Sequence, residues 1–151
     1  MKPIKRRQTG FSLIEVLITL VIMSVGMLGI AGLYVQSLQA GRTSMFRHHA
    51  VNLAGDVADR IRANPQAAGA YTAANGENNN CVLGGVDCSS AEMAANDIFL
   101  WKAQAAETLP AGDVTIVLDN AVFPPSYAIT VSWNEPGEEP TFVITVPVLG
   151  I

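Results

Sequence analysis

The sequence predicts an α+β fold in which one long N-terminal helix packs on a small C-terminal antiparallel sheet of about three strands, with a disulfide loop and a short helix between them. Three observations predict this fold. Helical periodicity continues from an apolar run at residues 11–35 into residues 36–64. The last forty or so residues alternate with a period of two, which is typical of half-buried strands. Two cysteines, Cys81 and Cys88, lie close together between these regions.

The first 35 residues have the composition of a membrane anchor with a basic leader. Four positive charges precede Gly10, and about 25 residues then follow with a single charge, Glu15. At about 1.5 Å per helical residue, this run can cross a hydrocarbon core of roughly 30 Å. Positive flanks stay in the cytoplasm. We therefore predict a leader at 1–10, a single transmembrane helix at 11–35 and an exported head at 36–151, in the periplasm.

Glu15 is the one charged residue of the apolar run. A carboxylate inside a membrane span costs on the order of 2.5 to 3.5 kcal/mol by insertion scales, so such a residue is a functional candidate. The neighbouring sequence offers it no cationic partner.

The segment Gly10-Phe11-Ser12-Leu13-Ile14-Glu15 resembles the class III signal of type IV pilins and type II secretion pseudopilins. The resemblance implies that a prepilin peptidase cuts after Gly10 and that the new N-terminal residue, Phe11, is N-methylated. It also implies that Glu15, at the fifth mature position, is needed for assembly, where it would neutralise the terminal amine of a neighbouring subunit. The alternative is a plain membrane anchor in which Glu15 lies near the interface.

Three glycines, Gly26, Gly29 and Gly32, recur near the end of the apolar run. Each costs about 1 kcal/mol relative to alanine in a helix interior. They indicate either close helix packing in a membrane or filament core, or local melting and flexibility during assembly. The sequence does not choose between the two.

The helical pattern continues to Asn64-Pro65, a stop signal. Asp56 and Arg60 have the spacing of an i,i+4 ion pair. His48 and His49 point about 100° apart on a helix and have no partner placed to complete a metal site, so no metal site is predicted. An apolar stripe with helical spacing predicts packing against the head, and its members are Phe46, Ala50, Leu53, Ala54, Val57, Ala58 and Ile61.

Residues 66–90 have a loop-like, turn-rich composition. On the predicted exported side disulfides persist, so Cys81 and Cys88 are expected to form one small-loop disulfide. Ser89 and Glu92 have capping-box spacing, which predicts a second helix that ends at Leu109-Pro110. Trp101 is expected to pack in the head.

Three segments alternate apolar and polar residues near the C-terminus: one around Val114–Leu118, one around Tyr127–Trp133 and one around Phe142–Val148. Proline-rich and glycine-containing segments separate them, so they predict an antiparallel meander with one apolar face on the long helix. Pro147 lacks an N–H donor and fits a strand end or an edge.

Charge and composition disfavour two classes of function, nucleic-acid binding and catalysis. The chain has a net charge of −4, and loss of the four basic leader residues leaves five Lys+Arg against thirteen Asp+Glu, a net charge of −8. This disfavours a nucleic-acid-binding surface, although it leaves a local basic spot open. The sequence shows no catalytic triad and no cofactor motif, so an enzyme is not expected.

The order of elements extends the resemblance over the whole chain. Residues 37–64, the helix with Trp101, and Leu109-Pro110-Ala111-Gly112 are most similar to minor pilins of the PilV type. This similarity implies a subunit that initiates type IV pilus assembly for adhesion and twitching motility. The implied partners are other minor pilins, the major pilin and the inner-membrane assembly platform, with a final location in the pilus, including its tip. The alternatives are a type II secretion pseudopilin and a pilus-borne module for adhesion or DNA uptake.

Overall fold

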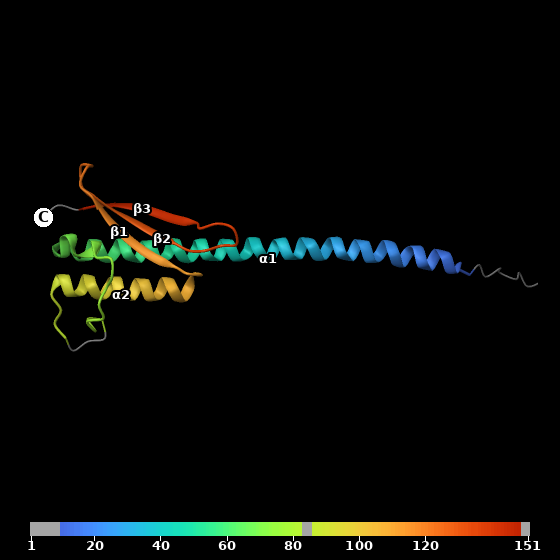
Figure 1. Cartoon of the computed structure of the whole chain (residues 1–151), viewed down its shortest axis with the longest axis horizontal. Coiled ribbons are helices and arrows are strands. Elements are labelled where there is room, and N and C mark those ends of the chain that lie inside the picture. Colours follow the sequence, from blue (N-terminus) through green and yellow to red (C-terminus); the bar gives the residue numbers. More distant parts are fainter. Residues whose placement is uncertain (1–9, 83–85, 149–151) are drawn as a thin grey trace, which may run out of the picture. The chain divides into compact units, whose positions relative to one another are not determined.

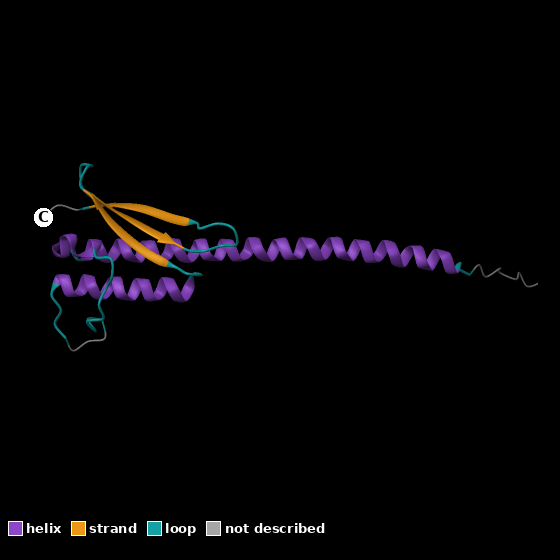
Figure 2. Ribbon diagram, viewed as in Figure 1, coloured by secondary structure: helices purple, strands orange, loops and turns teal. Residues whose placement is uncertain are grey.

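A computed structural model describes residues 10–82 and 86–148 (Figure 1). The element order is α1 (Leu13–Ala63), η1 (Pro65–Thr72), α2 (Ser90–Thr108), β1 (Asp113–Asp119), β2 (Ser126–Ser132) and β3 (Thr141–Pro147). Figure 2 shows the same helices, strands and loops by type. The chain divides into two compact units, one up to Arg42 and one from Thr43 onward, and α1 contributes to both. Nearly all of the predicted leader, residues 1–9, lies outside the described residues.

The C-terminal part of α1 forms the centre of the second unit. The predicted stripe is confirmed, because six of its seven members are buried and Phe46 packs against them partly buried. The Asp56–Arg60 ion pair is also confirmed, with Nε and Oδ2 3.2 Å apart. The helix ends at Ala63, directly before the predicted stop. It ends there because Pro65 has no N–H to donate and disfavours helical backbone at Asn64.

The segment after α1 differs from the prediction of a loop. Residues Pro65–Thr72 form a 3-10 helix, η1, with the proline at its first turn, where its fixed φ suits a helix start. Tyr71 of this helix is buried and stacks on Trp101, with ring centroids 5.9 Å apart. The buried Tyr71 side chain therefore fixes this alanine-rich segment in the head.

The predicted second helix is confirmed as α2. Ser89 accepts from the backbone N–H of Glu92, and the Glu92 side chain accepts from the backbone of Ser89, which together form the predicted capping box. The helix ends at Thr108, and Leu109 is its C-cap. Trp101 is buried as expected. Gly112 allows the sharp exit, since a Cβ there would collide with the Ala105 carbonyl.

The three strands form one antiparallel sheet in the order β1-β2-β3, as predicted. Apolar side chains alternate toward the core, with Val114 and Ile116 buried on β1 and Ile129 and Val131 on β2. Gly137 takes a φ of +88° in the turn before β3, a conformation that favours glycine. Pro147 ends β3, which is an edge strand, as its missing donor requires.

One hydrophobic core joins these elements. It contains side chains from the C-terminal half of α1, from η1, from α2 and from all three strands. In Figure 1, α2 runs alongside the C-terminal part of α1, and the sheet crosses the same part of α1. The pilin-like α+β fold predicted from the sequence is therefore the fold observed.

Candidate assembly and processing site

The segment around Gly10 and Phe11 precedes the first turn of α1 and has no regular secondary structure. Nothing lies within 4 Å of the position that a Cβ on Gly10 would take. The side chain of Phe11 is 84% exposed. Gly10 and Phe11 are therefore exposed and lie outside the helix.

Glu15 lies in the first turn of α1. Its backbone N–H donates to the Ser12 carbonyl at 3.1 Å and to Ser12 Oγ at 3.4 Å, which begins the helix. A negative side chain in this turn is favoured by the helix dipole. Among residues 10–82 and 86–148, its carboxylate has no hydrogen-bond or ion-pair partner. The sequence indicated that the Glu15 carboxylate has no cationic partner nearby, and it has none among the described residues of the folded chain.

In the first unit, α1 exposes a mostly apolar surface from Val16 to Val35. Each residue from Gly10 to Arg42 is exposed in the isolated chain. Leu13–Ala63 contains a window with a mean hydropathy of 2.5, none of it buried, long and apolar enough to cross a membrane. Thr19 donates to the Val16 carbonyl at 3.0 Å and Ser24 to the Val21 carbonyl at 2.8 Å. The hydroxyls are thus satisfied within the helix and need no water.

The helix is continuous through Gly26, Gly29 and Gly32. No side chain of the described residues lies within 4 Å of a Cβ built at any of them. The glycines therefore leave an open strip of backbone on α1. Neither close packing nor melting at these positions is excluded by this arrangement.

In the second unit, a polar network links α1, η1 and α2. Arg60 Nη1 donates to Asp97 Oδ1 at 2.9 Å, and Tyr71 Oη donates to Asp97 Oδ2 at 3.3 Å. Asn64 donates to Tyr71 Oη at 3.1 Å and to the Ser90 carbonyl at 2.9 Å. Asp97 is buried, so these bonds compensate for the loss of water around its charge.

The network changes the ionisation of its members. Burial raises the pKa of the Tyr71 phenol to about 12. Burial alone would lower the pKa of Arg60, but the carboxylates of Asp56 and Asp97 more than offset it, and the net direction is upward. Asp56 also accepts from Trp101 Nε1 at 2.9 Å. The raised pKa values keep the Tyr71 phenol neutral and the Arg60 guanidinium charged near neutral pH.

A second polar contact fixes the turn before β3 to α1. Glu135 accepts from Thr43 Oγ1 at 2.7 Å and from Trp133 Nε1 at 2.8 Å. The hydrogen bond from Trp133, and then that from Thr43, lowers the pKa of the Glu135 carboxyl. The sequence analysis did not single out Glu135, because its partner Thr43 is 92 positions away.

The Asn-rich segment packs on α2. Asn79 donates from its backbone to Asn96 Oδ1 at 3.1 Å and from its side chain to the Glu92 carbonyl at 3.1 Å. Gly76 lies so close to the backbone of α2 at Ala95 and Phe99 that a Cβ there would collide. The predicted disulfide between Cys81 and Cys88 is present. The disulfide and these contacts hold the segment against α2.

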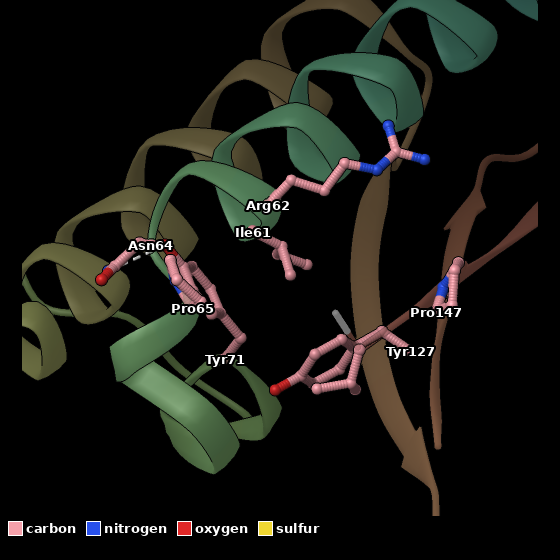
Figure 3. Close-up of a pocket in the computed structure, with 8 residues that line it drawn as sticks. Ile61, Arg62, Asn64, Pro65, Tyr71, Tyr127 and Pro147 are labelled. Atoms are coloured by element: carbon pink, nitrogen blue, oxygen red, sulfur yellow. Dashed lines mark hydrogen bonds between the residues drawn. The ribbon is translucent and has the colours of Figure 1, made fainter. Parts of the chain in front are cut away.

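The cavities of the second unit are either small or open to solvent. Figure 3 shows Tyr71 and Tyr127 near the end of α1, at a cavity of about 20 Å³ whose lining also includes Ile61, Pro65 and Pro147. That volume holds about one water molecule. In the described part of the chain, no three His, Cys, Asp or Glu side chains form a group that could hold a metal ion.

The chain combines a processing sequence, an exposed apolar helix with one unpaired carboxylate, and a disulfide-bearing α+β head. This combination is typical of membrane-anchored subunits that assemble through their N-terminal helices. Residues 5–31 match the family model of the prokaryotic N-terminal methylation motif, and residues 32–99 match that of type IV pilin Tt1218. Over residues 5–99 the chain is therefore similar to type IV pilins. Comparisons with curated proteins and with solved structures gave no significant match. The similarity implies processing by a prepilin peptidase, anchoring by the apolar helix and a place in a pilus.

Proposed function

We propose that the protein is a minor pilin that takes part in the initiation and assembly of type IV pili. A prepilin peptidase cuts after Gly10, Phe11 becomes the N-methylated terminus, and α1 holds the subunit in the inner membrane with its head in the periplasm. The subunit then joins the major pilin and other minor pilins at the assembly platform. The similarity of its head region to minor pilins supports this role.

The unpaired carboxylate of Glu15 is the observation that carries the proposal. It lies at the start of an exposed segment that carries no other charge up to Val35, and a charge in such surroundings needs a counter-charge. Cleavage after Gly10 creates one, the amine of Phe11, on every subunit. Glu15 of one subunit pairs with the Phe11 amine of its neighbour, so charge pairing sets the register of the helices.

The early position of the cysteines supports the minor role. Cys81 and Cys88 close a loop before α2, and the sheet that follows carries no cysteine. Major pilins usually carry a longer disulfide loop near the C-terminus. Gly26, Gly29 and Gly32 supply local flexibility to α1 during the transfer from membrane to filament, since nothing in residues 10–82 and 86–148 packs against them.

The test compares three substitutions of Glu15 in cells. Glu15→Ala and Glu15→Gln remove the charge, and we expect both proteins to be cut normally but to be depleted at least about tenfold from sheared pili, a loss worth about 1.4 kcal/mol. Glu15→Asp keeps the charge and is expected to retain part of the incorporation. Ser24→Ala, within the same helix, is the matched control and is expected to behave as the wild type.

Normal incorporation of Glu15→Ala would contradict charge pairing. Deletion of the gene tests the wider role, and the expected result is fewer surface pili and loss of twitching. Unchanged piliation with lost protein secretion would instead identify a type II secretion pseudopilin. Unchanged piliation with lost surface attachment or DNA uptake would identify a binding module carried on the pilus.

A further inference from the structure

The Asn-rich segment contains the one asparagine of the chain that a glycine follows, Asn75. The next residue, Gly76, must be a glycine, because a Cβ there would collide with backbone atoms of Ala95 and Phe99 on α2. All other asparagines of the chain precede a residue that has a side chain. The packing of this segment on α2 therefore fixes an Asn-Gly pair at this place.

An Asn-Gly pair can rearrange without an enzyme. The backbone nitrogen of the glycine attacks the side-chain amide carbon of the asparagine, a C–N bond forms, and the amide nitrogen leaves as ammonia. Water then opens the succinimide ring at either carbonyl and gives aspartate or isoaspartate. Glycine favours the reaction, because it has no side chain to shield the attacking nitrogen and its backbone adopts many conformations.

Both reacting groups are free in the folded head. Asn75 is exposed, and it lies in a bend outside the helices and strands. In the described part of the chain, neither the Asn75 side chain nor the N–H of Gly76 makes a hydrogen bond. The close contact of Gly76 with α2 is on the side where its Cβ would project, and its N–H donates to none of those atoms. The nitrogen is therefore available for attack.

The neighbouring asparagines are held differently. The Asn79 side chain donates to the Glu92 carbonyl at 3.1 Å, and the Asn78 side chain accepts from the N–H of Asn80 at 3.1 Å. Each of the three asparagines is followed by a residue with a side chain, which hinders attack by the next backbone nitrogen. The sequence and the contacts thus single out the same residue, Asn75.

We propose that Asn75 is a site of spontaneous deamidation, at which the nitrogen of Gly76 displaces ammonia and water yields aspartate and isoaspartate. The change adds one negative charge beside Glu77. In isoaspartate the main chain is one methylene longer, directly before the residue that lies tightly against α2. The extra length weakens the contact of the segment with α2, which includes the hydrogen bond from the Glu77 N–H to the Ala95 carbonyl at 3.0 Å.

The product accumulates with time and needs no ligand, so the modified fraction records the age of a folded subunit. The reaction is independent of Glu15, of processing and of the proposed role in pilus assembly, because it requires only the folded head and water.

Mass spectrometry of the full-length protein in detergent tests the proposal. The protein is incubated at mildly alkaline pH in water enriched in oxygen-18, and fragmentation of its peptides shows where the heavy oxygen enters. The label is expected at residue 75, as a mixture of aspartate and isoaspartate, at a rate at least about tenfold above that of any asparagine in residues 78–80. No label at residue 75, or equally fast labelling of residues 78–80, would overturn the proposal.

Two variants separate this chemistry from general damage. Asn75→Gln has a longer side chain, which closes a ring less readily, and it is expected to lose the label at residue 75 while urea unfolding stays unchanged. Asn78→Gln, in the same segment, is the matched control and is expected to keep the full rate at Asn75. A rate at Asn75 that falls equally in Asn78→Gln would contradict direct attack by Gly76.

Amide hydrogen exchange at Glu77 tests the effect on the contact with α2. Asn75→Asp carries the charge of the products without the longer main chain, so its Glu77 amide is expected to exchange as in the unmodified protein. The isoaspartate form is expected to exchange there about tenfold or more faster, because opening of this hydrogen bond controls the rate. Equal exchange in the isoaspartate form and in Asn75→Asp would show that the modification does not loosen the segment.

Discussion

The two parts of α1 are built from one continuous helix but have opposite surfaces. From Leu13 to Arg42 every residue is exposed in the chain, and from Val16 to Val35 the residues are uncharged and mostly apolar. From Thr43 to Ala63 the helix buries one stripe and exposes polar residues on the other side. A helix shows an amphipathic period only where its surroundings differ from side to side. The N-terminal part is suited to a uniformly apolar environment, and the C-terminal part to a boundary between protein core and water.

The comparison also explains where the polar groups lie. The hydroxyls of Thr19 and Ser24 donate within the helix itself. Arg60 and Asp56, by contrast, reach side chains on α2. These two hydroxyls therefore need no external partner, whereas Glu15 in the same part of α1 has a charge without one. Those in the C-terminal part bind the rest of the head.

The largest expected effect comes from the same substitution in the two parts of α1. Leu53→Ala removes a side chain that is 2% exposed and is expected to lower the free energy of unfolding of the head by about 2 to 5 kcal/mol. Leu28→Ala, where the side chain is 73% exposed, is expected to change it by less than about 0.5 kcal/mol. Urea unfolding followed by tryptophan fluorescence reports on the head alone, because both tryptophans, Trp101 and Trp133, lie there. Equal effects would show that the two parts share one core.

The second prediction compares two carboxylates that pair with arginines. Asp97→Ala leaves Arg60 and Tyr71 without their buried acceptor and is expected to cost about 3 kcal/mol. Asp59→Ala breaks an exposed pair with Arg62 and is expected to cost less than about 1 kcal/mol. The same urea titration measures both. A small loss for Asp97→Ala would mean that the network does not hold α2 to α1.

The third prediction concerns alkaline pH. The pKa of Tyr71 is raised to about 12 in the folded head, above about 10 in an unfolded chain, so the folded state holds the proton more tightly. The contribution is fully present below pH 10 and is lost as the pH rises toward 12. The expected loss is roughly 2 to 3 kcal/mol. Tyr71→Phe is expected to remove this part of the alkaline dependence, and the ultraviolet absorbance of the phenolate locates the transition. An unchanged pH dependence in Tyr71→Phe would contradict the assignment.

The smallest expected effect is at the start of α2. Ser89→Ala removes the cap and is expected to cost about 1 kcal/mol, while Ser90→Ala, one position later, is expected to cost much less. Hydrogen bonds from Ser89 lower the pKa of Glu92, so this contribution is present above the ordinary carboxyl pKa and is lost as the pH falls through the lowered one. Ser89→Ala should raise the Glu92 pKa, as measured by carboxyl NMR titration. An unchanged pKa would show that the capping box is not formed.

Local patterns predicted most of the fold. The stripe on α1, the stop at Asn64-Pro65, the Ser89–Glu92 box and the three alternating strands depend on residues a few positions apart. The disulfide also followed, since its cysteines close a short loop. The helix η1 was missed because the alanine-rich segment has no period of its own. Its order depends on Tyr71 reaching Trp101 and Asp97, which lie 30 and 26 positions away.

The sequence identified the N-terminal motif of the candidate site, but it gave no indication of the open edge of β3. Gly10, Phe11 and Glu15 form a motif that can be read without any tertiary contact, because it lies within six consecutive residues. The open edge of β3 could not be read in this way. Alternation identifies a strand, but only the sheet order shows which strand is left with an unpaired side.

By itself, the sequence determined the long apolar helix, its N-terminal motif, the single charge of its apolar run and the order of helices and strands in the head. These depend on hydropathy, period and local capping, which act over one or two turns of chain. Only the tertiary structure decided that Asp97 is buried beside Arg60, that the Asn-rich segment packs on α2 and that β3 keeps an open edge. The physical reason is that hydrogen bonds and burial between distant residues exist only once the core has brought their elements together.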